Sequence, residues 1–205
     1  MNKTVELFND RIVKNNPVLA KILGICSALA VTNLMENALV MSIGVIFVTA
    51  FSEWTVSLLR NYTEKHVRMM VQVMVIAWYV IIVDMALKLY LPDISKALGP
   101  YVGLIITNCI IMGRCEAYAQ HNKPSQAFLD GVASGTAYAI ILLIIAFFRE
   151  LLGFGSLFRI EILGGWWRNI AVMSMPAGAF FMIGILIWIS NTYALKADKR
   201  GERQW

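Results

Sequence analysis

The chain has 205 residues, of which 59% are hydrophobic and only 15% are charged, and its mean hydropathy is +0.65. An ordinary soluble domain has roughly 45–50% apolar and about 25% charged residues, so this composition excludes one and predicts an integral membrane protein. The net charge of +5 comes from dispersed basic residues without an aromatic-lined basic stripe. This pattern favours the lipid bilayer as the partner and argues against nucleic acid.

The chain begins with a polar segment, residues 1–16, which lacks the apolar core of a removable signal peptide. We expect it to be a short cytoplasmic segment that lies on the membrane surface. The apolar residues then gather in six segments, at 18–32, 37–59, 67–91, 98–113, 128–148 and 170–193. Crossing a bilayer takes about 20 apolar residues, so the first and fourth segments are short and predict half-helices or broken helices.

The order of the segments is short, long, long, and then short, long, long again. This order predicts an all-α membrane protein with six transmembrane helices in two inverted three-helix repeats, the first helix of each being short or broken. The membrane domain would span residues 17–193, with repeats at about 17–91 and 98–193, and the tail 194–205 would be polar. Within the fifth segment, Gly131 and Gly135 have the small-residue spacing that lets helices approach closely.

Six crossings put both chain ends on one side of the membrane. With this topology, thirteen of the 18 lysine and arginine residues fall on the side of the termini. Because basic residues concentrate in cytoplasmic loops, we predict that both termini are cytoplasmic. Arg149 and Glu150 follow the fifth segment, where we expect an ion pair at the membrane interface.

Each short segment carries a cysteine near its middle, Cys26 in the first and Cys109 in the fourth. A cysteine in a transmembrane helix is usually only a small apolar side chain. Broken helices, however, often mark a binding site at the midplane of the membrane. Two thiolates would be half of the ligand set of a [2Fe-2S] cluster or of a structural zinc site, so a second protein chain would have to supply the rest.

The other metal-binding residue types have simpler interpretations. We expect His66 and His121 to be solvated loop residues near the cytoplasmic side, and Cys115 to be incidental. Asp84 and Asp130 lie within or at the edge of spans, where a carboxylate is costly and therefore a functional candidate. Each could belong to an ion pathway, or each could simply be paired with a neighbouring base or a helix end.

Three stretches carry a resemblance to a known family: 23–32 (LGICSALAVT), 102–114 (VGLIITNCIIMGR) and 147–153 (FFRELLG). They resemble the NqrD/RnfE family, whose members are membrane components of the sodium-translocating NADH:quinone oxidoreductase (NqrD) and of the Rnf ferredoxin:NAD oxidoreductase complex (RnfE). The resemblance covers nearly the whole chain. Ser27 directly after Cys26 is more similar to the quinone reductase branch, because the Rnf branch tends to have proline there.

The resemblance implies a component of the bacterial inner membrane, paired with a homologous partner of opposite orientation, NqrE. In that family the two partners hold one [2Fe-2S] cluster at the membrane centre with two cysteines each, and Cys26 and Cys109 occupy the matching positions. The cluster would relay electrons from the NADH-oxidising component NqrF towards a periplasmic flavin, with flavins carried by NqrB and NqrC, and sodium export would be coupled to this transfer. Acidic residues around Asp84 and Asp130 would matter for sodium uptake.

The sequence therefore leaves three alternative functions. The first is an electron-transfer component of a redox-driven sodium pump, with the Rnf-type protein as its close alternative. The second is a secondary transporter without a redox centre, to which inverted repeats with broken helices also point. The third is a structural scaffold. The chain has no nucleotide-binding glycine loop, so we do not expect it to oxidise NADH alone.

Overall fold

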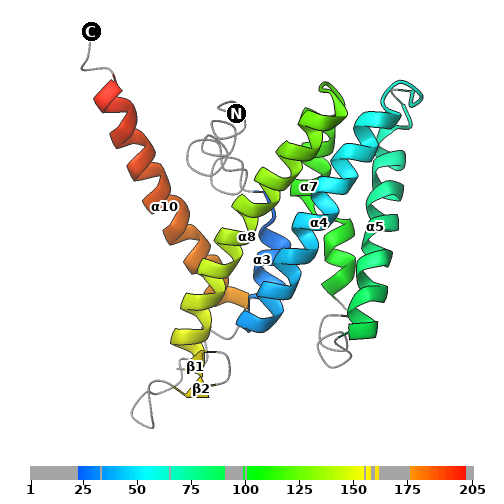
Figure 1. Cartoon of the computed structure of the whole chain (residues 1–205). Helices are drawn as coiled ribbons and strands as arrows, with labels where there is room; N and C mark the ends of the chain where they lie inside the picture. Colours follow the sequence, from blue (N-terminus) through cyan, green and yellow to red (C-terminus); the bar gives the residue numbers. More distant parts are fainter. Residues whose placement is uncertain are drawn as a thin grey trace.

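Helices make up almost all of the chain that the structure, a computed structural model, describes (Figure 1). The described residues are 23–32, 34–64, 66–90, 99, 101–154, 156–157, 160–161 and 176–201. In chain order the elements are α3 (Ile25–Val31), α4 (Met35–Leu59), α5 (Arg68–Tyr90), α7 (Cys109–Arg114), the π-helix η2 (Cys115–Ala119), α8 (Pro124–Phe154), β1 (Ser156–Leu157), β2 (Ile160–Glu161) and α10 (Pro176–Gly201). The predicted surface segment 1–16 lies outside the described residues.

Four helical stretches are long and apolar enough to cross a membrane. They are Met35–Leu59, Arg68–Tyr90, Tyr101–Ala119 and Pro124–Gly153, and α10 adds a shorter apolar stretch at Gly178–Ile189. A helix of 23 residues, the length of α5, rises about 35 Å and exceeds the roughly 30 Å of a hydrocarbon core. The helical membrane protein predicted from composition is therefore confirmed, as are the spans predicted at 37–59, 67–91 and 128–148.

Helices α4 and α8 pack backbone against backbone. A Cβ atom added to Gly131 would lie 2.7 Å from the Cα atom of Ala50, and one added to Gly135 would lie 2.9 Å from the Cα atom of Ile46. No side chain fits at either distance, so the two backbones touch through the glycines. The predicted small-residue contact is confirmed, and the apolar core around it draws mainly on α4 and α8, with residues of α3, α5, α7, η2 and α10.

Helix α8 runs past the point where its apolar segment ends. Arg149 and Glu150, which we expected at the membrane interface, lie inside the helix and are each only 1% exposed. The helix ends at Phe154 and is followed by a two-residue antiparallel pair in which Ser156 faces Glu161. A charged residue ends an apolar segment in the sequence, but the helix can continue through it when the charged group finds a partner inside the protein.

Those partners are the two helix ends at the junction of α3 and α4. A guanidinium nitrogen of Arg149 donates to the carbonyl oxygen of Leu29 at 3.0 Å and to the hydroxyl of Thr32 at 2.9 Å, at the C-terminal end of α3. The carboxylate of Glu150 accepts the backbone N–H of Met35 at 2.7 Å, at the N-terminal end of α4. Each charge also has the sign that its helix end favours.

The fourth apolar segment is longer than predicted. We expected it to end at Gly113, but the helical chain continues through η2 to Ala119. The charge that follows, Arg114, is 7% exposed and forms an ion pair with the carboxylate of Asp130 on α8. Its guanidinium group also lies 5.2 Å from the ring centroid of Tyr118. Paired in this way, the arginine does not have to end the span.

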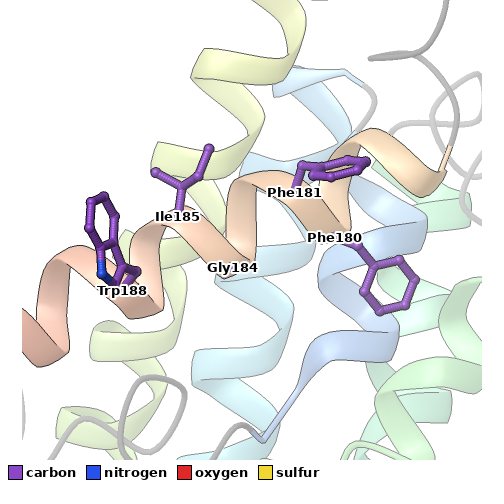
Figure 2. A pocket seen from close by; sticks show the side chains of 5 residues that line it. All are labelled: Phe180, Phe181, Gly184, Ile185 and Trp188. Atoms are coloured by element: carbon purple, nitrogen blue, oxygen red, sulfur yellow. The ribbon is translucent and has the colours of Figure 1, made fainter.

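Two helices lie at the edge of the described bundle. Only 17% of the apolar window of α5 is buried, against 61% for α8. Helix α10 diverges from α8 towards its C-terminal end (Figure 1). Figure 2 shows the outward face of α10, which is formed by Phe180, Phe181, Gly184, Ile185 and Trp188. The predicted polar tail is helical as far as Gly201.

The glycine contact predicts how α4 and α8 respond to one added methyl group. Gly131→Ala should destabilise the protein by about 1–3 kcal/mol, because the Cβ atom would collide with backbone, which cannot rotate away. The measurement is the thermal unfolding temperature of the purified protein in detergent. Gly184→Ala is the matched control, because a Cβ atom there meets no atom within 4 Å. Equal unfolding temperatures for the two variants would contradict the packing role.

The contacts of Arg149 predict a second stability difference. Arg149→Met should cost about 1–3 kcal/mol, because the Leu29 carbonyl loses its charged donor and the arginine that provides it is almost fully buried. Arg60→Met removes a similar bond, 3.0 Å to the carbonyl of Asn122, at a half-buried position and should cost less. Thermal unfolding of both variants checks the order, and a larger loss for Arg60→Met would contradict it.

Candidate functional site

The helix that carries Cys26 begins abruptly inside the bundle. Gly24 precedes α3 with φ +83°, a left-handed conformation that side chains rarely adopt. Space there is equally restrictive, since a Cβ atom on Gly24 would lie 2.7 Å from the Ile110 side chain and 2.9 Å from the Tyr138 ring. Glycine therefore lets the chain turn tightly into α3, and the Cys26 side chain, at the second helical residue, is exposed in the isolated chain.

The helix that carries Cys109 begins in the same way. Residues 101–106 are helical, the chain leaves the helix at Thr107 and Asn108, and α7 starts at Cys109. Asn108 has an extended ψ of 115°, and its side-chain oxygen accepts the backbone N–H of Ile110 at 3.0 Å. Asparagine is a preferred residue at this capping position. The predicted break in the fourth segment is thus confirmed, and its cysteine is the first residue of the new helix.

One hydrogen bond brings the two breaks together. The backbone N–H of Gly24, two residues before Cys26, donates to the sulfur of Cys109 at 2.9 Å across 85 residues of sequence. Cys109 is partly buried and Cys26 is exposed, so the pair extends from the interior of the bundle to its surface. Hydrogen bonds to cysteine sulfurs are a feature of metal sites that are held by cysteine.

Three buried polar side chains surround this contact. The hydroxyl of Ser27 donates to the carbonyl oxygen of Gly24 at 3.2 Å and is hydrogen-bonded to the hydroxyl of Tyr138. The Tyr138 hydroxyl also reaches the Gly24 carbonyl at 3.3 Å, and the amide of Asn108 donates to the Ser27 oxygen at 3.4 Å. Together with Gly24, these three side chains link α3, the start of α7 and α8.

The remaining metal-binding residue types lie elsewhere. His66 and His121 are exposed in turns, as expected. Cys115 is fully buried in η2, although its place beside Arg114 and Glu116 in the sequence indicates a more solvated position. Within the part of the chain that the structure describes, no group of three or more His, Cys, Asp or Glu side chains could hold a metal ion. The contact from the Gly24 N–H to the Cys109 sulfur therefore remains the observed link between the two cysteine-bearing segments in this part of the chain.

Both predicted carboxylates are in ion pairs. Asp130 is 1% exposed and pairs with Arg114. Asp84 lies on α5, where one of its oxygens is 2.6 Å from the ammonium nitrogen of Lys88 one turn later. Pairing was the alternative that the sequence left open for these residues, and it does not exclude a place in an ion pathway.

Sequence reasoning missed the residues that support the cysteines. Asn108 could have been found, because asparagine before a new helix is a recognisable cap. Tyr138 gives no such signal, since a tyrosine in an apolar helix reads as an interface or core aromatic. Arg149 and Glu150 marked only the end of a span in the sequence, although their partners lie at the ends of α3 and α4.

Comparison with known proteins identifies the family of the chain. The sequence profile of the family described as "Rnf-Nqr subunit, membrane protein" matches residues 4–187. The chain is 52% identical to a protein of Shewanella denitrificans over 187 residues, covering 89% of each chain, and 48% identical to one of Psychromonas ingrahamii over 196 residues, covering 93% of each. Both relatives are named as the D-type subunit of the Na(+)-translocating NADH-quinone reductase. By the extent of these matches, the chain belongs to the Rnf-Nqr family of membrane subunits.

Proposed function

We propose that this chain is the NqrD component of a sodium-translocating NADH:quinone reductase and that Cys26 and Cys109 hold half of a [2Fe-2S] cluster near the membrane midplane. The first part of the proposal is supported by relatives about half identical over nine-tenths of the chain. The second is carried by one observation, the Gly24 N–H that donates to the sulfur of Cys109 beside the start of the helix that carries Cys26.

The residues around the sulfurs fit such a cluster. Thiolates are the usual ligands, and backbone donors to sulfur are among the features that set cluster potentials. The exposed Cys26 side chain can meet a second protein, whereas a cysteine with a purely packing role is usually buried. The proposal draws the other two thiolates from the homologous partner NqrE, which lies in the membrane with opposite orientation.

A [2Fe-2S] cluster supplies one-electron transfer when it is bound. The chain's own residues hold the sulfurs in place, donate the Gly24 N–H to Cys109, and enclose the site with the apolar side chains of the core. In the proposed complex the electrons come from the cytoplasmic NADH-oxidising component NqrF and continue towards a periplasmic flavin, with flavins on NqrB and NqrC. Sodium export is coupled to this transfer.

The proposed topology has six helices in two inverted repeats in a bacterial inner membrane, with both termini in the cytoplasm. Helix α3 begins at Ile25, and α7 begins at Cys109 after the helix is interrupted at residues 107 and 108. Each of these helix starts lies in the first segment of its proposed half and has a cysteine within its first two residues, which supports the repeat. The four long spans and the shorter apolar stretch in α10 are compatible with this arrangement.

The cluster assignment predicts a selective loss of iron. Cys109→Ser should abolish one [2Fe-2S] signal in the low-temperature electron paramagnetic resonance spectrum of the purified complex and remove about two irons per complex, because a serine is a poor substitute for a thiolate ligand. Cys115→Ser is the matched control and should leave both unchanged, since Cys115 is buried in η2 away from the pair.

The same experiment separates the remaining functions. An unchanged spectrum and iron count in Cys109→Ser would contradict the cluster. A secondary transporter or a scaffold would in that case account for the chain, since neither needs iron.

We also propose that Asp84 and Asp130 take part in a sodium pathway, because hard oxygen ligands suit sodium and carboxylates are costly in a membrane. Asp84→Asn should raise the sodium concentration for half-maximal quinone reductase activity severalfold. Lys88→Met breaks the same ion pair but keeps the carboxylate, and should leave that concentration unchanged. Equal shifts in both variants would assign Asp84 to the ion pair alone.

A further inference from the structure

We propose that Tyr138 is a positioning residue that sets the reduction potential of the cysteine site through Gly24. The inference rests on the proposed cluster at Cys26 and Cys109 and deepens it. Tyr138 touches neither sulfur in any hydrogen bond of the described chain; its hydroxyl reaches the Gly24 carbonyl at 3.3 Å and the hydroxyl of Ser27.

The geometry makes Gly24 the link. Its N–H donates to the Cys109 sulfur at 2.9 Å, while its carbonyl oxygen lies within reach of three donors. These donors are the Ser27 hydroxyl at 3.2 Å, the Ala28 backbone N–H at 3.2 Å and the Tyr138 hydroxyl at 3.3 Å. Because the two hydroxyls are also hydrogen-bonded to each other and each has one proton, one of them donates to the carbonyl at a time. The carbonyl and the N–H of Gly24 belong to neighbouring peptide groups, so anchoring the carbonyl limits how far the N–H can turn away from the sulfur.

The tyrosine also fixes Gly24 by contact. Tyr138 has no exposed surface, and its ring edge would be 2.9 Å from a Cβ atom on Gly24. Gly24 has a left-handed φ of +83°, and glycine is the residue with most conformational freedom in the unfolded chain. A free glycine would let the N–H swing away from the sulfur. The ring and hydroxyl of Tyr138 restrict that movement from the side of α8.

An N–H directed at a cysteine sulfur acts on the charge of the site. Adding an electron adds negative charge to the sulfurs and iron, and a donor stabilises negative charge, so the N–H raises the reduction potential. Loosening Gly24 weakens this bond and lowers the potential. The two thiolates themselves are untouched, so binding of iron is preserved.

The test is a redox titration of the purified complex, followed by electron paramagnetic resonance, with iron counted in each sample. Tyr138→Phe removes only the hydroxyl and should keep the iron content and the signal while lowering the midpoint potential. A tenfold change in the ratio of oxidised to reduced cluster corresponds to about 59 mV for one electron, and we expect a shift of severalfold in that ratio.

Two further variants make the result specific. Tyr79→Phe removes a hydroxyl that is hydrogen-bonded to Thr55 at 2.8 Å on the other side of α4, and should leave the potential unchanged. Ser27→Ala removes another donor to the Gly24 carbonyl and should lower the potential in the same direction as Tyr138→Phe.

Each outcome decides the inference. A midpoint potential in Tyr138→Phe equal to that of the unaltered complex overturns it, and so does an equal shift in Tyr79→Phe. Loss of iron in Tyr138→Phe also overturns it, because the residue would then be needed to build the site and not to tune it. Absence of any [2Fe-2S] signal in the unaltered complex would instead refute the proposed function.

Discussion

Hydrocarbon contains no water to satisfy the end of a helix, and every unpaired backbone N–H or C=O there costs several kcal/mol. Helix ends of this chain, at the junction of α3 and α4 and at the start of α7, lie among buried side chains, where a similar cost applies. The structure meets it with side chains from other segments. Arg149 and Glu150 take the ends of α3 and α4, and Asn108 takes the start of α7. The breaks are stable only because α8 and the capping residues lie beside them.

One backbone donor at the start of α3 is bonded to a cysteine and not to a capping side chain. The Gly24 N–H lies just before the first turn of α3 and donates to the sulfur of Cys109. A sulfur thus satisfies a backbone donor, and the donor in turn stabilises charge on the sulfur. The contact also ties residues 85 positions apart in the chain to each other. A single bond therefore serves the fold and the proposed redox site at once.

Hydropathy predicted the spans of α4, α5 and α8, because long apolar runs have few alternatives to crossing a bilayer. The short segments and the cysteine in each singled out Cys26 and Cys109, and the structure places both in the first turn of a helix. Asn108 could have been recognised as a cap, but Tyr138 was out of reach, since its position depends on how α8 packs on α4 through Gly131. Hydropathy also placed the end of α8 too early, because it counts the charge of Arg149 but not the carbonyl group that accepts its hydrogen bond.

The caps from α8 have a consequence for the order of biosynthesis. Met35 and Leu29 receive their partners from residues 115 and 120 positions later in the chain. While the ribosome is still making the first half, the ends of α3 and α4 lack these two charged partners. The first half can enter the membrane, but it reaches its final form only after the helix of the second half has been inserted. The ends of α3 and α4 are therefore completed only when α8 is in place.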